Sequence, residues 1–277
     1  MKLRSLLFVP ADRPERFAKA AASGADALIL DLEDSVAPEK KAEGREHIAQ
    51  WLAGPRICPS FVRINPLDSG LAAEDLAAIL PFHPDGLVLP KAEGAVSVEA
   101  LVTMLGAAKL PILPIATETP AAIFQLGSYQ KVSQHLAGLT WGAEDLPAAI
   151  GAATSRETDG RYTAPYEMVR GLTLFGAHAA NTAPIETVFP SISDPEGLTA
   201  YVARARRDGF TGMMAIHPAQ IETINQGFTP SAAEIRHAQA VVDAFAANPG
   251  AGALKLEGKM IDRPHLIQAR RILAMAG

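Results

Sequence analysis

The 277-residue sequence has a single cysteine, Cys58, and only 6% aromatic residues. A lone cysteine excludes a disulfide-stapled fold and a zinc site built on paired cysteines. No apolar run reaches the roughly 18 residues that a membrane-spanning helix needs. The first run, residues 6–9, is also shorter than the roughly 7–15 residues of a secretory signal core. We therefore expect a cytoplasmic protein in a reducing compartment.

The charge balance narrows the class of protein further. Thirty acidic and 25 basic residues give a formal net charge of −5, and the chain has no run of Lys or Arg. This pattern disfavours nucleic acid as a partner. A hydrophobic content of 48% with so modest a charge excludes an intrinsically disordered chain. We expect a folded protein that binds neither nucleic acid nor a membrane.

Eight short apolar runs recur along the chain and predict its fold class. Runs of four to eight apolar residues suit strands that are buried on both faces, as in a parallel sheet. Helical stretches separate them, and eight successive strand–helix units predict an α/β fold of the TIM (β/α)8 barrel type. An open doubly wound sheet is disfavoured because no G-x-G-x-x-G motif follows the first run. The runs are residues 5–10, 27–31, 61–66, 86–90, 112–116, 138–142, 185–190 and 212–216.

The chain is longer than such a barrel requires. We expect the barrel to span residues 1–228, with an extra element near residues 151–166, where the interval between runs is longest. Residues 229–277 predict two further helices around a Gly-rich hinge at 250–252. A tail of this length is expected to lack its own core and to dock as a lid or oligomerisation segment, on this barrel or on a neighbouring subunit.

Polar side chains lie in the last residues of the predicted strands or just after them, at the end of a barrel where catalytic groups lie. Each acid alone could cap a helix, Lys91 could pair with an acid or form a Schiff base, and His217 before Pro218 is typical of a turn. Several carboxylates at one mouth repel unless a cation neutralises them, and oxygen ligands favour Mg²⁺ or Mn²⁺ over zinc. The residues are Asp31, Glu33, Asp34, Arg63, Asn65, Lys91, Glu93, Glu118, Glu144, Asp145 and His217.

Eight segments, in order along the chain, resemble the citrate lyase β-subunit-like branch of the HpcH/HpaI aldolase and citrate lyase superfamily. They are residues 4–11, 30–36, 62–65, 89–91, 118–120, 142–146, 216–218 and 258–264. The resemblance implies a Mg²⁺-dependent lyase that cleaves citryl-, malyl- or citramalyl-CoA to acetyl-CoA and a 2-oxo acid. It also implies a homo-oligomer, a trimer or a multiple of trimers. The aldolase branch has a histidine after the second strand, whereas Glu33 is followed here by Asp34, which favours the thioester branch.

The resemblance implies roles for individual residues. Glu118 and Asp145 correspond to metal ligands, Arg63 to a substrate-binding arginine, and Asp262 to the acid of a C-terminal lid that in several relatives covers a neighbouring subunit. Beside these, Asp31, Glu33 and Asp34 are expected to orient metal-bound water, Lys91 or Arg63. The backbone N–H groups at the sixth strand end could hold the substrate carboxylate; they belong to Gly142, Ala143, Glu144 and Asp145. Arg13, Arg16 and Lys91 are expected to bind the CoA phosphates, although two arginines on a solvated helix face are equally common.

Three other functions stay open. A malyl-CoA thioesterase would use the same metal site and release free CoA without acetyl-CoA. A class II aldolase would act on free hydroxy-oxo acids without CoA. A non-catalytic subunit would work only inside a complex with an acyl carrier protein, so activity of the isolated chain on CoA thioesters would argue against it.

Overall fold

The computed structural model describes residues 2–276, which form two compact units, one ending at Asn225 and one beginning at Gln226. The first unit is built on a curled parallel sheet with the strand order β5-β4-β3-β2-β1-β7-β6. No helix among the described residues is long and apolar enough to cross a membrane.

All seven strands coincide with predicted apolar runs, and nearly all of their residues are buried. Apolar side chains on both faces suit strands covered by helices on one side and by one another on the other. The strands are β1 (Ser5–Pro10), β2 (Ala27–Asp31), β3 (Ser60–Arg63), β4 (Gly86–Leu89), β5 (Ile112–Pro114), β6 (Ile185–Glu186) and β7 (Gly212–Ala215).

The remaining predicted run, residues 138–142, is represented by isolated parallel bridges rather than by a strand. Thr140 pairs with Ile115 beyond the end of β5, and Leu139 pairs with Pro184 just before β6. The segment therefore lies between the two edge strands of the sheet. The predicted α/β class is confirmed, and the curled parallel sheet is consistent with a TIM-like barrel.

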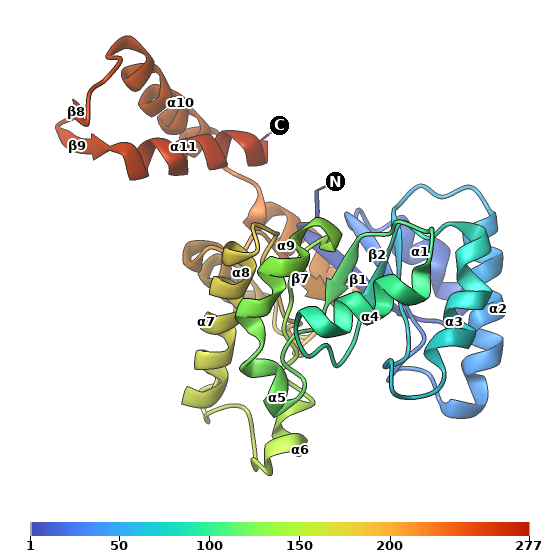
Figure 1. The fold of residues 1–277 in the computed structure, drawn as a ribbon. Helices are drawn as coiled ribbons and strands as arrows, with labels where there is room; N and C mark the ends of the chain where they lie inside the picture. Colours follow the sequence, from blue (N-terminus) through green and yellow to red (C-terminus); the bar gives the residue numbers. More distant parts are fainter. Residues whose placement is uncertain (1, 277) are drawn as a thin grey trace. The chain divides into compact units, whose positions relative to one another are not determined.

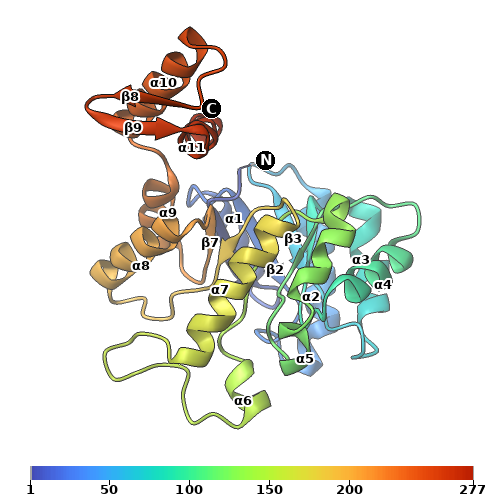
Figure 2. The same ribbon diagram turned by 60° about the vertical axis from the view of Figure 1, so that its left-hand side comes forward.

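Helices of the first unit surround this sheet (Figure 1), and the rotated view shows α7 and α8 on one side of it with α2, α3 and α4 on another (Figure 2). They are α1 (Phe17–Ala21), α2 (Lys41–Ala53), α3 (Ala72–Ile79), α4 (Ala95–Leu105), α5 (Pro120–Ile123), α6 (Leu146–Ile150), α7 (Ala164–Ala179) and α8 (Pro195–Asp208), and α9 (Ile221–Phe228) runs from the first unit into the second. Short 3-10 helices complete them: η1 (Pro14–Arg16), η2 (Pro38–Lys40), η3 (Leu80–Phe82), η4 (Leu126–His135) and η5 (Pro218–Gln220).

Two helical segments differ from the prediction. The helical stretch expected between the fifth and sixth apolar runs divides into α5 and η4, and η4 has non-helical backbone at Val132. The sequence indicated only an extra element near residues 151–166, whereas the structure has a loop there followed by the 16-residue α7.

The inner face of the sheet carries an apolar cluster that fixes how the strand ends align. Gly86 shows how closely this cluster packs, because a Cβ atom added there would lie 2.3 Å from the Phe61 ring. Close packing of this kind holds the polar residues beyond the strand ends at fixed separations. The cluster contains Leu6, Ala27, Ile29, Phe61, Val88, Leu113, Ile115, Ile185 and Met214.

The second unit is a helical pair with a β-hairpin. It contains α10 (Ala232–Ala247), β8 (Ala253–Leu256), β9 (Lys259–Asp262) and α11 (Arg263–Ala276). Ser231 and Glu234 form a capping box at the start of α10. The hairpin turns at Glu257 and Gly258, both with positive φ, as a two-residue turn requires.

The expectation that this tail lacks its own core is wrong. Ala238 and Val241 of α10, Ile261 of β9 and Ala269 of α11 form a buried cluster. Leu254, Leu256, Phe245 and other partly buried side chains pack around it. The hairpin, which pattern reading left unassigned, supplies the third layer that makes this cluster possible.

Candidate active site

Arg63 at the end of β3 is held by carboxylates on the neighbouring strand. Its Nε and Nη2 donate to Oδ1 and Oδ2 of Asp31, both at 2.6 Å, because the sheet register places the two residues side by side. Its Nη1 lies 2.7 Å from Oε2 of Glu33, and its guanidinium stacks 4.9 Å from the ring centre of Phe8. Burial opposes ionisation of Asp31, but the charge and hydrogen bonds of Arg63 outweigh it and keep the pKa of Asp31 below its usual value.

Lys91, just after β4, connects the carboxylates of three other strand ends. Its Nζ lies 2.7 Å from Oε1 of Glu33, 3.8 Å from Oδ1 of Asp145 and 4.0 Å from Oδ1 of Asp34. Its backbone N–H donates to Oε2 of Glu118 at 2.5 Å. Lys91 has a φ of 48°, an uncommon conformation for a non-glycine residue that persists only where the surroundings enforce it.

Glu118 is the most perturbed acid at this end of the sheet. Burial, and then the nearby carboxylates of Glu33 and Asp145, raise the pKa of Glu118 to about 8, although the hydrogen bond from Lys91 opposes the shift. Gly142 allows its side chain to sit where it does, because an added Cβ would lie 2.9 Å from Cγ of Glu118. Because this carboxyl group is buried and faces two others, its negative charge must be neutralised by a proton or by a cation.

Helix capping, the simplest alternative role for these acids, is performed by other groups. Thr119 caps α5, accepting a hydrogen bond from Ala122 N, and Glu118 beside it does not take part. No side chain within residues 2–276 caps the first turn of α6, so Asp145 does not serve there. His217 accepts from Ala219 N in a capping box with Gln220, which confirms the interpretation of His217 as a turn residue.

The other predicted site residues lie at varied places. The Gly142 N–H donates to Oγ1 of Thr117 at 3.1 Å, so this backbone donor is already engaged. Glu144 is exposed and Ala143 is buried. Arg13 and Arg16 are exposed and pair loosely with their neighbours Asp12 and Glu15, at 4.0 and 3.8 Å. Asp262 belongs to the second unit.

Lys41 also lies at this end of the sheet, and the sequence did not predict its role there. Its Nζ donates to the carbonyl oxygens of Leu32 and Glu33 and to Oδ1 of Asn65, at 2.8, 3.2 and 2.6 Å. It thus fixes the backbone that carries Glu33. A lysine at the start of a long charged helix gives no sequence signal for such a role, because α2 is mostly solvated.

A second buried ion pair, which the sequence did not predict, supports the segment of residues 138–142 between β5 and β6. Glu186 accepts from Nε1 of Trp141 at 2.6 Å and from Nε of Arg170 at 2.7 Å. Nη1 of Arg170 in turn donates to Asp208 at 2.7 Å. Trp141 precedes Gly142, so this network anchors the segment that leads to Asp145. Arg170 lies on α7, the helix absent from the prediction.

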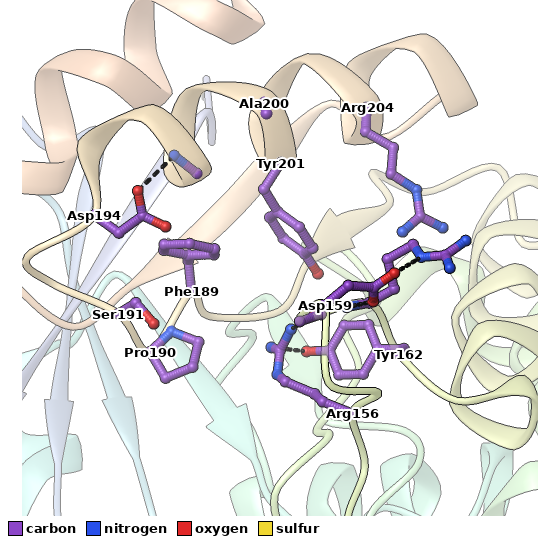
Figure 3. A pocket seen from close by; sticks show the side chains of 13 residues that line it. Arg156, Asp159, Tyr162, Phe189, Pro190, Ser191, Asp194, Ala200, Tyr201 and Arg204 are labelled. Carbon is purple, nitrogen blue, oxygen red and sulfur yellow. Dashed lines mark hydrogen bonds and ion pairs between the residues drawn. The ribbon is translucent and has the colours of Figure 1, made fainter.

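A separate cavity of about 380 Å³ lies between the loop near residues 156–162 and the start of α8. Figure 3 shows Arg156 reaching across Tyr162, whose hydroxyl accepts from Nη2 of Arg156 at 2.8 Å, with Phe189 and Tyr201 on the far side. The carboxylates around Lys91 do not line this cavity.

The acids Asp31, Glu33, Asp34, Glu118 and Asp145 form what we call the carboxylate cluster. This cluster fits a divalent cation that needs few protein ligands. Within residues 2–276 there is no group of three or more His, Cys, Asp and Glu side chains arranged to hold a metal. Glu118 and Asp145 nevertheless approach each other closely enough to raise the pKa of Glu118. Mg²⁺ is commonly bound by one or two carboxylates, with water and substrate oxygens completing its octahedron. Two acids suit Mg²⁺ and do not suit a structural zinc site.

Comparison with known proteins identifies the family of this chain. The family model described as HpcH/HpaI aldolase/citrate lyase matches residues 4–218. A citrate lyase subunit beta-like protein of Mycobacterium tuberculosis is 36% identical over 98% of this chain and 94% of its own length. A (3S)-malyl-CoA thioesterase of Cereibacter sphaeroides is 32% identical over 99% of this chain and 94% of its own.

Comparison with solved structures identifies the same family. The protein CitE from Mycobacterium tuberculosis, in complex with magnesium, acetoacetate and coenzyme A, superposes with a TM-score of 0.82 at 35% identity, covering 99% of this chain and 98% of that one. RipC from Yersinia pestis gives a TM-score of 0.70 at 36% identity, covering 82% of this chain and 96% of that one. The chain belongs to the HpcH/HpaI aldolase/citrate lyase family.

Proposed function

We propose that this protein is a Mg²⁺-dependent carbon–carbon lyase that cleaves a 3-hydroxyacyl-CoA thioester bearing a carboxylate on its hydroxyl carbon. The observation that carries the proposal is the buried Glu118, whose pKa is raised by burial and by Glu33 and Asp145, next to an arginine fixed by two acids. The CitE relative solved with magnesium, acetoacetate and coenzyme A supports both the metal and the thioester. Citramalyl-, malyl- and citryl-CoA are the candidate substrates.

The site would sit on a closed (β/α)8 barrel over residues 1–228. In this arrangement residues 138–142 serve as the sixth strand, between β5 and β6. The bridges of Leu139 and Thr140 to both edges support this closure. The mouth would then bring Glu118 and Asp145 from adjacent strand ends toward one centre, as in other barrel enzymes.

Glu118 and Asp145 are the residues that would hold Mg²⁺. When bound, the ion supplies Lewis-acid stabilisation of the alkoxide that develops on the substrate hydroxyl. Lys91 positions both ligands, through its backbone N–H to Glu118 and its ammonium near Asp145. Glu33 and Asp34 keep that ammonium in place.

Arg63 binds the substrate oxygens with a preorganised positive charge. Two of its five N–H donors are hydrogen-bonded to Asp31, and Nη1 forms an ion pair with Glu33; the remaining N–H groups would bind the substrate carboxylate or the developing oxyanion. Removing a preorganised donor of this kind typically raises the barrier by about 3–4 kcal/mol. The backbone N–H groups of residues 143–145 would help to hold the carboxylate.

Asp262 is the proposed proton carrier. The substrate hydroxyl gives its proton to solvent, the bond between the hydroxyl carbon and the thioester α-carbon breaks, and a 2-oxo acid and the enolate of acetyl-CoA are left. Asp262 protonates the enolate carbon, and in the condensation direction it removes the same proton. We propose that residues 229–277 act as a lid that brings Asp262 over the mouth of a neighbouring subunit in a trimer or a multiple of trimers.

CoA recognition falls to exposed cations near the first strand end. Arg13 and Arg16 follow β1 at its carboxyl end, and their acidic neighbours are 3.8–4.0 Å away, so both side chains can turn toward phosphates. Lys91 was also a candidate for this role, but its contacts with Glu33 and Asp145 assign it to the carboxylate cluster in our proposal.

The test is product analysis on a panel of CoA thioesters. The purified protein with Mg²⁺ should release acetyl-CoA and a 2-oxo acid from citramalyl- or malyl-CoA, and EDTA should stop the reaction. Asp262→Asn should abolish cleavage and leave Mg²⁺ binding intact. Failure of every thioester in the presence of Mg²⁺ would refute the proposed activity.

A thioesterase is the second candidate, because the (3S)-malyl-CoA thioesterase relative covers nearly the whole chain. It would use water as the nucleophile at the same metal site. Malate and free CoA, without acetyl-CoA or glyoxylate, would identify this activity in the same assay. A class II aldolase would instead turn over free hydroxy-oxo acids in the absence of any CoA.

A further inference from the structure

Asp262 has a close partner within its own unit. Oδ1 of Asp262, at the end of β9, lies 2.5 Å from Nδ1 of His265 in the first turn of α11. The backbone N of Asp262 lies 3.2 Å from the same nitrogen. The shorter contact is with the carboxylate, which favours a protonated Nδ1 that donates to Oδ1. Both side chains are exposed, at 36% and 49%, so both are available to a substrate.

The hairpin directs this pair away from the small core of its unit. Strand pairing sets Asp262 opposite Ala253 and Met260 opposite Lys255, so these four share one face. Ile261, between them, is buried on the other face. Lys255 on β8 shares this face of the hairpin, and Arg263 follows Asp262 at the start of α11; both are cationic.

A carboxylate in this setting holds its proton poorly. The hydrogen bond with His265 lowers the pKa of Asp262 below its usual value, so Asp262 is ionised at neutral pH. An ionised Asp262 can accept a proton in the condensation direction. In the cleavage direction it has none to give, and the enolate carbon needs one. Histidine is the side chain that ordinarily gains and loses a proton close to neutral pH.

We propose that Asp262 and His265 form one proton-transfer pair, in which His265 stores the proton that Asp262 passes to the substrate carbon. This inference rests on the proposed lyase function. In cleavage the pair begins as imidazolium and carboxylate; the proton moves from Nδ1 to Oδ1 and from there to the enolate carbon. The pair ends as neutral imidazole and carboxylate, and acetyl-CoA has gained the proton. The proton that the substrate hydroxyl released to solvent balances the one that the imidazole takes up again from solvent. Condensation runs through the same states in reverse.

His265→Gln separates proton storage from a structural role. A glutamine at this position can accept from the Asp262 backbone N–H, as the third helical residue of a capping box does, so it can support the start of α11, but it carries no titratable proton. His237 offers a matched control, because its Nδ1 lies 3.7 Å from Oε2 of Glu257 in the same unit, with no link to Asp262. His237→Gln should leave cleavage unchanged.

The expected result is a change in both rate and pH profile. His265→Gln should slow cleavage at pH 7 by about 10²-fold, the lower end of what general acid–base catalysis contributes. Wild-type cleavage should decline as the pH rises, because the pair then loses its stored proton, and the variant should lack that decline. Imidazole in solution should restore part of the cleavage activity of His265→Ala and none of that of Asp262→Asn.

The other possible results distinguish a failure of the proton-transfer pair from a failure of the lyase proposal. An active wild type with a His265→Gln variant of equal rate and identical pH profile would overturn the proton-transfer pair and leave the lyase proposal intact. A slow variant that keeps the wild-type pH profile and does not respond to imidazole would also overturn it, since only positioning would then be lost. A wild type that cleaves no thioester would overturn the lyase proposal itself.

Discussion

Gly142, at the end of the segment 138–142, determines how closely this segment can approach the buried side chain of Glu118. A Cβ at this position would lie 2.9 Å from Cγ of Glu118 and 3.3 Å from Ile115, distances that force the carboxylate to move. Gly142→Ala should therefore weaken Mg²⁺ binding by about tenfold or more, because metal sites depend on exact ligand placement. Titration calorimetry with Mg²⁺ measures the change.

The matched control for that substitution is Gly171→Ala. Gly171 lies within α7, and the described residues leave open space where its Cβ would stand. This variant should bind Mg²⁺ like the wild type and gain slightly in helix stability. Equal Mg²⁺ affinity in the two variants would show that Glu118 is not a ligand.

Glu118 also predicts how the stability of the metal-free protein depends on pH. Burial and nearby carboxylates raise its pKa from 4.5 to about 8 in the folded state. Between these values the folded chain binds more protons than the unfolded chain, so the free energy of unfolding falls as the pH rises. With EDTA present, Tm should be lower at pH 8 than at pH 6.

Glu118→Gln is the comparison for the pH dependence. A glutamine cannot ionise, so this variant should lose less of its Tm between pH 6 and pH 8 than the wild type does. Thermal unfolding followed by circular dichroism in the two buffers gives both values. Parallel slopes for the two proteins would mean that another group governs the pH dependence.

At the scale of secondary structure, the capping box at the start of α10 supports the second unit. Ser231 accepts from Glu234 N, and Glu234 accepts from Ser231 N at 2.7 Å. Ser231→Ala should destabilise this unit by about 1 kcal/mol, the usual effect of losing such a cap. Hydrogen exchange followed by mass spectrometry should show faster exchange in α10 and α11 and unchanged exchange in β1–β5. Uniformly faster exchange would mean that the two units unfold together.

The strands could be predicted from the sequence, whereas several helices could not. Buried parallel strands are continuous apolar runs, and this pattern located β1 and β7 as well as those between them. Helix α7 was missed because its charged and apolar residues follow a polar, Gly-rich loop that obscures where it begins. The hairpin of β8 and β9 was missed because its open face carries Lys255 and Met260, and neither a period of two nor a helical period dominates.

The residues of the carboxylate cluster were named from the sequence, but their connections were not. Position after a strand end was enough to single out Arg63, Lys91 and Glu118. Lys41 and Glu186 reach the cluster or its support from elsewhere in the fold, through side chains whose direction only packing decides. Conversely, Arg13 and Arg16 remain predictions, because an exposed arginine makes few contacts that would reveal its role.

At the scale of the whole molecule, the chain separates two tasks. The first unit concentrates acids and the guanidinium of Arg63 at one end of its sheet. The second unit has its own core and presents Asp262 on an open hairpin face. If Asp262 serves a neighbouring subunit, neither unit of one chain suffices, and activity requires assembly.

Mixing two inactive variants tests this division. In our proposal Asp262→Asn keeps both Mg²⁺ ligands intact, and Glu118→Ala keeps the acid of the lid intact. If each lid serves a neighbouring mouth, as in a ring of heterologous contacts, equal co-expression should restore about one quarter of wild-type activity, since half of the mouths are intact and half of these meet an intact lid. If each lid served its own chain, no mouth in the mixture would have both residues. The mixture would then stay inactive, and the lid would act within one subunit.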